Sequence, residues 1–176
     1  MSAILRNRIF GLVLAAAIFL VDQWLKFQVQ WTWELPQRGV IDLLSFFDLR
    51  WTENRGVSLG LLTAESMEMR WGLVALTAAI AITVFIWLLR EKLLGDILPL
   101  AMVLGGAMGN IRDRAKLGYV IDYADFHIGE FRPFLIFNLA DAAITIGVVI
   151  ILARSFLSRE KREPQAPAAA DAAPES

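Results

Sequence analysis

The 176-residue sequence contains no cysteine and only one histidine, His127. The absence of cysteine excludes disulfides, a thiol nucleophile and thiolate metal sites. A single histidine excludes a metal site that needs several histidines of this chain, and the HExxH motif of zinc peptidases does not occur. The formal net charge of -1 gives no reason to expect a nucleic-acid partner. The sequence therefore predicts neither a metal site nor another cofactor.

Apolar residues are abundant instead: they make up 57% of the chain, and the mean hydropathy is +0.54. A soluble core of this length could not bury so much apolar surface, so lipid must solvate much of the chain. Four apolar runs approach the ~20 residues that a helix needs to cross a bilayer. They cover about 9–29, 71–89, 97–111 and 135–153. The pattern predicts an all-α membrane protein with four transmembrane helices.

The first run has an alternative interpretation as a cleaved signal peptide, because Arg6 and Arg8 precede it. The apolar stretch, however, continues into residues 22–26 without a convincing small-residue cleavage site. We therefore expect the first span to be retained. Residues 1–162 are predicted to form one membrane domain, and the Pro- and Ala-rich segment 163–176 a disordered tail.

Lysine and arginine residues beside the spans predict the orientation of the chain. Three short segments that must share one side of the membrane are rich in them. These residues are Arg6, Arg8, Arg90, Lys92, Arg154, Arg159, Lys161 and Arg162. The opposite side also carries basic residues, but over much longer segments. The higher density favours an inner (plasma) membrane protein with both termini in the cytoplasm.

The longer of the two outer segments, about 30–70, is predicted to contain a small sheet. Residues 47–53 alternate between apolar and polar side chains, which is the period of a half-buried strand. Residues 40–44 are the expected partner strand, with a turn near Ser45. The sheet would lie on the outer membrane surface, between the first and second transmembrane helices. The residues expected at headgroup depth are Trp31, Trp33 and Trp51.

Ionisable residues within an apolar span are expensive and mark candidate functional sites. Asp22 and Lys26 lie four positions apart in the first span, so they share a helix face and can pair. They are either a neutralised pair near the outer interface, with Lys26 extending toward water, or a pair that orients an active site.

The third span ends in a segment that mixes small and polar residues. Gly105 and Gly109 form a face on which another helix can approach closely. Asn110 and Arg114 follow one turn apart, and Arg114 is a natural partner for a nearby carboxylate.

Two aspartates are predicted to meet at the outer edge of the membrane. Asp141 lies about two turns inside the fourth span, three residues after Asn138, although the helix dipole alone also favours an acid there. Asp122 follows a short apolar, strand-like run. One short loop joins the third and fourth spans, so the two carboxyl groups can converge. One of them would then keep its proton and polarise a scissile carbonyl, while the ionised one activates water.

Other functions remain open on the residues alone. Spacing does not exclude a Ser–Lys pair of Ser58 with Lys26, whereas His127 lies in an outer segment and no GxSxG motif occurs. A non-enzymatic transporter or assembly subunit could use Asp22, Lys26 and Asp141 as a proton path. The lack of inverted repeats and broken helices argues against that alternative.

Five segments taken together resemble the signal peptidase II family, the lipoprotein signal peptidases. The segments are Asp22-Gln23-x-x-Lys26, 54–60, 105–114, 120–123 and 137–141, in the order found in the family. The resemblance implies an aspartic endopeptidase that cuts prolipoproteins just before a diacylglyceryl-modified cysteine, at the outer face of the membrane. It also implies contact with membrane lipid and inhibition by globomycin-type cyclic peptides.

The same resemblance assigns roles to individual residues. Asp122 and Asp141 would be the catalytic dyad, and Asp122 is preferred to Asp125 because it follows the paired apolar residues. The implied polar support around the dyad or the substrate is Asn54, Asn110, Arg114 and Asn138, beside Asp22 and Lys26. Two departures from the family pattern are Leu59, where an aromatic residue is frequent, and Met108, where leucine is frequent.

Overall fold

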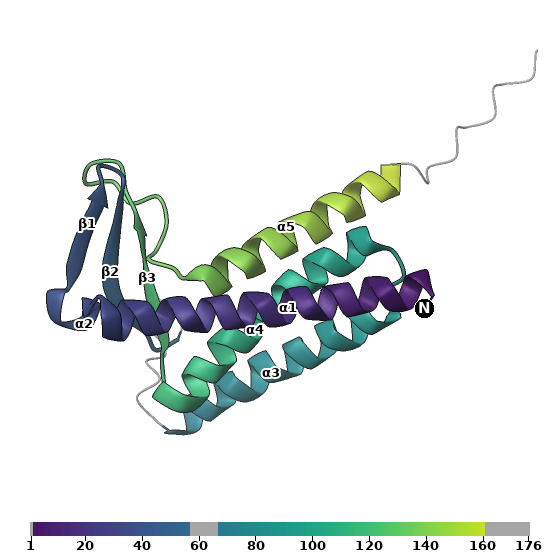
Figure 1. Ribbon diagram of the computed structural model, residues 1–176, viewed down its shortest axis with the longest axis horizontal. Helices are drawn as coiled ribbons and strands as arrows, with labels where there is room; N and C mark the ends of the chain where they lie inside the picture. Colours follow the sequence, from purple (N-terminus) through teal and green to yellow (C-terminus); the bar gives the residue numbers. More distant parts are fainter. Residues whose placement is uncertain (1, 57–66, 161–176) are drawn as a thin grey trace, which may run out of the picture.

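The computed structural model of the protein describes residues 2–56 and 67–160. Long helices run side by side, and a three-stranded sheet lies across one end of them (Figure 1). We call this end of the molecule the sheet end and the opposite end, which carries the N-terminus, the N-terminal end. In the described part of the chain, 4 helices are long and apolar enough to cross a membrane, as the sequence predicted.

Each long helix differs from its predicted apolar run at one end or at both. Helix α1 (Ala3–Phe27) continues as a π-helical segment (Gln28–Thr32), and α3 spans Met67–Arg90. Helix α4 (Leu94–Leu117) extends past the apolar run and ends where Gly118 adopts a positive φ of 89°. Helix α5 (Leu139–Glu160) begins later than predicted.

The late start of α5 has a local cause. The Oδ1 atom of Asn138 accepts the backbone N–H of Asp141 at 2.9 Å, so Asn138 caps the helix. Asp141 therefore lies in the first turn of α5, and the prediction that it lies about two turns inside the helix is wrong. Hydropathy alone placed the boundary at the first apolar residues, which precede the cap.

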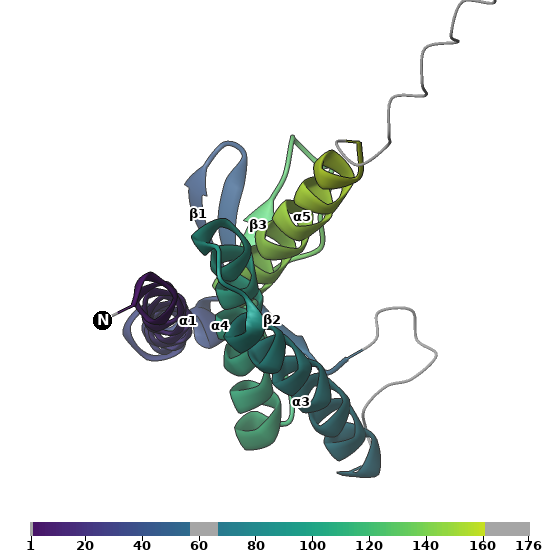
Figure 2. The same ribbon diagram turned by 90° about the vertical axis from the view of Figure 1, so that its right-hand side faces the viewer.

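Helix α4 is the central helix, with α1, α3 and α5 around it (Figure 2). Its glycines allow this close packing: a Cβ atom on Gly105 would lie 2.5 Å from the Ala15 carbonyl oxygen of α1. A Cβ atom on Gly106 would overlap the Ala140 carbonyl oxygen of α5. The predicted small-residue face of α4 is confirmed toward α1, and Gly106 adds a second such contact toward α5.

The predicted hairpin forms as β1 (Val40–Leu44) and β2 (Phe47–Asn54), entered through the short helix α2 (Leu35–Arg38). A third strand, β3 (Val120–Phe126), comes from the connection between α4 and α5 and pairs antiparallel with β2. The sheet is thus not confined to the segment between the first two long helices. An isolated hairpin is marginal in water, and the added strand makes β2 the central strand.

The sheet and the helices share an apolar core at the sheet end. Val29 and Leu35 are fully buried, and they pack in one cluster with Leu49 of β2 and Ile121 of β3. This cluster fixes the sheet on the end of α1. Ser58, Leu59 and the predicted tail 163–176 lie outside the described residues, so the predictions for them stand untested.

Candidate active site

Asp122 lies on β3, where the register of the sheet sets its neighbours. The pairing of Thr52 with Asp122 and of Asn54 with Val120 brings Asn54 of β2 beside the carboxylate. The Nδ2 atom of Asn54 donates to Asp122 Oδ2 at 3.0 Å. Asp122 is only 2% exposed, so its carboxylate depends on such donors.

Asp141 lies at the start of α5 in a reciprocal cap. The backbone N–H of Asn138 donates to Asp141 Oδ2 at 3.3 Å, while Asn138 Oδ1 accepts the N–H of Asp141. This is the geometry of a capping box, with Asp141 at the third helical position. The helix-start role considered from the sequence therefore applies, and it holds the carboxylate in a fixed direction.

Asn138 also joins the two aspartates. Its Nδ2 atom donates to Asp122 Oδ1 at 2.6 Å, and the residue is fully buried. The structure thus brings Asp122, from a strand, and Asp141, from a helix, to opposite sides of one asparagine. Burial, followed by the charge of the neighbouring Asp141, raises the pKa of Asp122 to about 6.

Asn110 connects Asp141 to a buried network of charged side chains. Asn110 Nδ2 donates to Asp141 Oδ1 at 2.8 Å, and Asn110 Oδ1 accepts from Lys26 Nζ at 3.2 Å. The ammonium of Lys26 also lies 2.9 Å from Asp22 Oδ2 and 2.7 Å from Asp113 Oδ2. A continuous chain of contacts therefore runs from Lys26 through Asn110 to Asp141.

The structure changes the interpretation of three residues here. Lys26 is 2% exposed, so the alternative in which it extends toward water is wrong, because two buried carboxylates hold its ammonium inward. Asp113 was not among the predicted site residues, although its position three after Asn110 on the same helix was a signal for it. Asp22 has a further contact that spacing did not reveal: its Oδ1 accepts the backbone N–H of Ala140 at 3.1 Å.

Arg114 lies close enough to the site for its charge to interact with those of Asp141, Asp122 and Asp113. Its Nε atom is buried and finds no hydrogen-bond acceptor within the described residues. The predicted ion pair of Arg114 with a carboxylate is not among the ion pairs of the described chain. Among the described residues, this buried guanidinium N–H therefore lacks an acceptor.

Two cavities reach the carboxylates from the surface. A cavity of about 550 Å³ is lined by Asp122 and Asn54, and one of about 280 Å³ by Asp141 and Thr145. The exposed apolar pair Phe134 and Leu135 borders both of them. An extended peptide with an apolar substituent fits this arrangement, since polar groups lie inside and apolar side chains lie at the rim.

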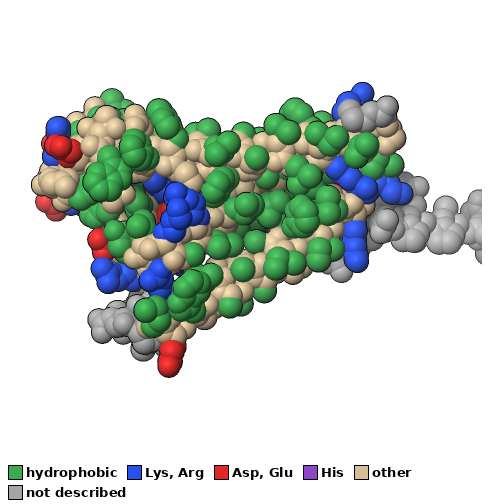
Figure 3. All heavy atoms as spheres, turned by 60° about the horizontal axis from the view of Figure 1, so that its bottom comes forward, with side chains coloured by type: hydrophobic (Ala, Val, Ile, Leu, Met, Phe, Trp, Pro, Cys, Tyr) green, Lys and Arg blue, Asp and Glu red, His purple; other side chains and the backbone are tan. Residues whose placement is uncertain are grey.

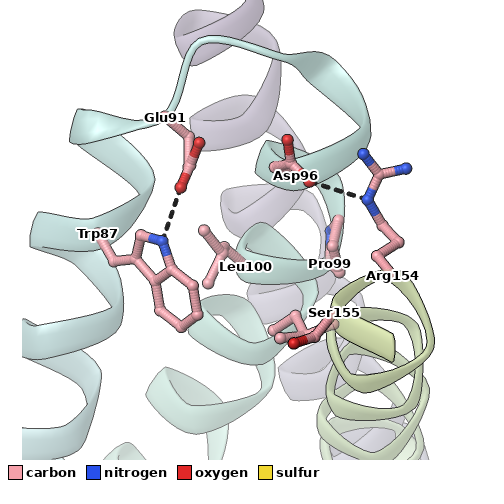
Figure 4. Close-up of a pocket in the computed structure, with 8 residues that line it drawn as sticks. Trp87, Glu91, Asp96, Pro99, Leu100, Arg154 and Ser155 are labelled. Atoms are coloured by element: carbon pink, nitrogen blue, oxygen red, sulfur yellow. Dashed lines mark hydrogen bonds and ion pairs between the residues drawn. The ribbon is translucent and has the colours of Figure 1, made fainter. Parts of the chain in front are cut away.

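A further cavity of about 210 Å³ lies away from these residues, between α3, α4 and α5 near the N-terminal end (Figure 4). Four of its side chains are paired with one another: Trp87 Nε1 donates to Glu91 at 2.8 Å, and Arg154 Nε lies 2.8 Å from Asp96 Oδ1. It contains none of the predicted site residues.

The other candidate groups have structural partners. Asp125 is fully buried, but hydrogen bonds from Arg132 and Arg50 outweigh the effect of burial and lower its pKa. His127 Nε2 lies 2.9 Å from Asp48 Oδ2. Lys26 Nζ lies in ion pairs with Asp22 and Asp113, while Ser58, its alternative partner from the sequence, lies outside the described residues. The described residues hold no group of three or more His, Asp or Glu side chains arranged for a metal ion.

Comparison with known proteins gives consistent matches over most of the chain. A family model described as Signal peptidase (SPase) II matches residues 14–157. The lipoprotein signal peptidase of Sphingopyxis alaskensis is 51% identical over 152 residues, which cover 86% of this chain and 88% of the relative. That of Rhizorhabdus wittichii is 52% identical over 158 residues, covering 90% and 92%.

Solved structures agree with the fold. A bacterial membrane enzyme determined by the in meso method at 2.3 Å resolution has a TM-score of 0.75 and 23% identity, covering 90% of this chain and 94% of that one. A second one, at 1.9 Å resolution, has a TM-score of 0.70 and 26% identity, covering 83% and 92%. The family model matches residues 14–157, and the two relatives are 51% and 52% identical to this chain. The chain therefore belongs to the signal peptidase II family.

Proposed function

We propose that the protein is an aspartic endopeptidase that removes signal peptides from diacylglyceryl-modified prolipoproteins, cutting just before the lipidated cysteine. The observation that carries the proposal is the joining of Asp122 and Asp141 through Asn138, at hydrogen bonds of 2.6 Å and 2.9 Å. Membership of the signal peptidase II family supplies the substrate class.

The two aspartates of the dyad have different roles, one as the general acid and the other as the general base. Asp122 carries the shared proton, because burial and Asp141 raise its pKa to about 6. Asp141, whose oxygens accept N–H groups from Asn110 and Asn138, acts as the base. Asp141 takes a proton from the attacking water, while Asp122 donates to the scissile carbonyl oxygen. As the tetrahedral intermediate collapses, the proton on Asp141 passes to the leaving amine, and the hydroxyl formed from the carbonyl returns its proton to Asp122, which restores both carboxyl groups.

Supporting residues hold this arrangement and the substrate. Asn54 and Asn138 fix Asp122 from two sides, while Asp22 and Lys26 set the position of Asn110 and the start of α5. We assign Arg114, whose charge interacts with those of Asp141 and Asp122, to the polar support of the dyad. The same cavities would hold globomycin-type cyclic peptides.

The substrate also explains where the site must lie. Burying a diacyl chain contributes ~0.8 kcal/mol per methylene, so the lipidated cysteine stays in the bilayer and its scissile bond near the headgroups. The sheet end carries the dyad, so we place that end at the outer face of a bacterial inner membrane. Both termini are then cytoplasmic.

A cleavage assay tests this function. Purified protein in detergent should cut a lipobox peptide whose cysteine carries diacylglycerol, and the new N-terminus should be that cysteine. The same peptide without the lipid should be cut poorly, because it loses its anchor at the rim of the site. Equal cleavage of both peptides, or a cut at another bond, would reject the assignment of the substrate. Globomycin should block cleavage of the lipidated peptide.

A further inference from the structure

A groove runs along the side of the bundle that does not carry the dyad. Helices α1 and α3 meet at the N-terminal end, where a Cβ atom on Gly11 would lie 3.8 Å from Leu88 Cδ1. They diverge toward the sheet end, and α4 forms the floor between them (Figures 1 and 2). The groove has a volume of about 540 Å³ and an almost wholly apolar lining, which includes Leu20, Ile82 and Met108.

A basic hollow continues this groove at the sheet end. Its volume is about 230 Å³, and its lining includes Arg112, Lys116, Phe27 and Trp31. Arg112 and Lys116 lie one turn apart on α4, and both are exposed. Lysine and arginine side chains gather where the helices meet the sheet, beside the apolar face (Figure 3).

The two cations are not neutralised within the described chain. Arg112 donates to the amide oxygen of Gln23, a neutral partner. Neither Arg112 nor Lys116 is in an ion pair with a described carboxylate, and the adjacent Asp113 is already bound by Lys26. Within residues 2–56 and 67–160, two exposed positive charges therefore face the hollow without a carboxylate partner.

The groove and the hollow form one surface. On α1 the lining passes from Ala16 and Leu20 to Gln23 and Phe27, at the three- and four-residue spacing of one helix face. On α4 it passes from Met108 to the cations in the same direction. We call this surface, from Leu12 to Trp31 along α1, the α1–α4 seam. It shares no lining residue with the cavities at Asp122 and Asp141.

We propose that the α1–α4 seam binds a glycerophospholipid with an anionic headgroup. Its phosphate lies between Arg112 and Lys116, and one acyl chain lies in the apolar groove. Basic pockets beside transmembrane helices recognise anionic headgroups in this way. Exposed aromatic residues at the same level, Phe27 and Trp31, are typical of the headgroup region. The charge of the hollow selects the phosphate, and the length of the groove selects a lipid over a free anion.

Native mass spectrometry of the full chain tests the site directly. The purified protein is mixed with phosphatidylglycerol or with phosphatidylcholine of the same acyl chains, each in detergent micelles. We expect preferential retention of phosphatidylglycerol. The double substitution Arg112→Gln, Lys116→Gln should weaken the affinity for phosphatidylglycerol about 30-fold, because each cation near a lipid surface contributes about 1 kcal/mol. The matched control Arg38→Gln, Lys92→Gln removes two exposed charges elsewhere and should leave the affinity unchanged.

A second pair of variants tests the groove. Ala78 lines it, and Ala79 is the next, exposed residue of α3 outside the lining. Ala78→Phe should reduce retention of the lipid, whereas Ala79→Phe should not. Circular dichroism and melting confirm that each variant is folded before binding is compared. Equal retention of both lipids by the parent protein would overturn the proposal.

Two further outcomes also contradict it. Inorganic phosphate that displaces the lipid at equal concentration would show that the acyl chain adds no affinity. A dimer mass that Ala78→Phe converts to a monomer would show that a second copy of the chain covers the groove.

Discussion

Asn138 Nδ2 lies 2.6 Å from Asp122 Oδ1, while Oδ1 of the same side chain caps α5 by accepting the N–H of Asp141 at 2.9 Å. The amide of Asn138 cannot turn without losing both contacts. The position of Asp122 relative to Asp141 is therefore set by a helix cap, which is a local and stable element.

Substitution of either aspartate tests the proposed dyad. Asp122→Asn and Asp141→Asn preserve volume but remove the ionisable proton, so each should lower turnover of the lipidated peptide by about 10²- to 10⁴-fold. The double variant should be scarcely worse than either single one, because the two carboxyls act as a unit. Asp125→Asn is the control and should retain turnover, since Asp125 binds Arg50 and Arg132 instead. Near-normal turnover by Asp122→Asn or Asp141→Asn would reject the aspartic mechanism.

The raised pKa of Asp122 predicts a pH dependence of stability. The folded protein binds this proton up to about pH 6, and the unfolded chain only up to about 3.8. The stability contributed by the protonated carboxyl is fully present below pH 3.8 and is lost as pH rises through 6. Asp122→Asn cannot titrate, so its stability relative to the parent should rise across this window. Unfolding in mixed detergent micelles at several pH values measures the difference, and parallel curves would contradict the prediction.

Lys26 is predicted to be a large contributor to stability. Lys26→Met would leave Asp22 and Asp113 buried without their cation. Removing one partner of a buried ion pair lowers the free energy of unfolding by about 3–5 kcal/mol. Arg154→Met is the control, because its ion pair with Asp96 is exposed and contributes at most about 1 kcal/mol. Equilibrium unfolding compares the two. Similar losses for both variants would show that the buried charges are not coupled as described.

The glycines of α4 predict a contrast between two Gly→Ala changes. Gly106→Ala should destabilise the protein strongly, because the new Cβ meets the backbone of α5, which cannot move aside as a side chain can. Gly72→Ala on α3 meets nothing within 4 Å. It should be neutral or stabilising, by up to about 1 kcal/mol of helix propensity. Melting temperatures of the purified variants would show the contrast, and tolerance of Gly106→Ala would disprove tight α4–α5 packing.

Single cysteines test the orientation, since the chain has none of its own. Gln37→Cys lies beside the sheet and is expected outside, whereas Leu93→Cys lies between α3 and α4 at the N-terminal end and is expected in the cytoplasm. An impermeant thiol reagent added to intact cells should label the first and not the second. The opposite pattern would invert the proposed topology.

The sequence by itself determined the parts that depend on local composition. Hydropathy marks the four spans because each run must be solvated by lipid along its own length. The alternation in residues 47–53 and the turn near Ser45 define the hairpin, since strand period and turn are local as well. The motifs around Asp122 and Asp141 likewise identify the family without any knowledge of their distance.

Only the tertiary structure decided how these parts meet. The pairing of β3 with β2 joins two segments that are far apart in the sequence, and no local pattern states which strands will pair. The inward position of Lys26 depends on Asp113, which lies on another helix. The apolar run before α5 conceals the cap at Asn138, because a cap is defined by the direction of one side chain. Burial and charge coupling, which the fold creates, then give Asp122 its raised pKa.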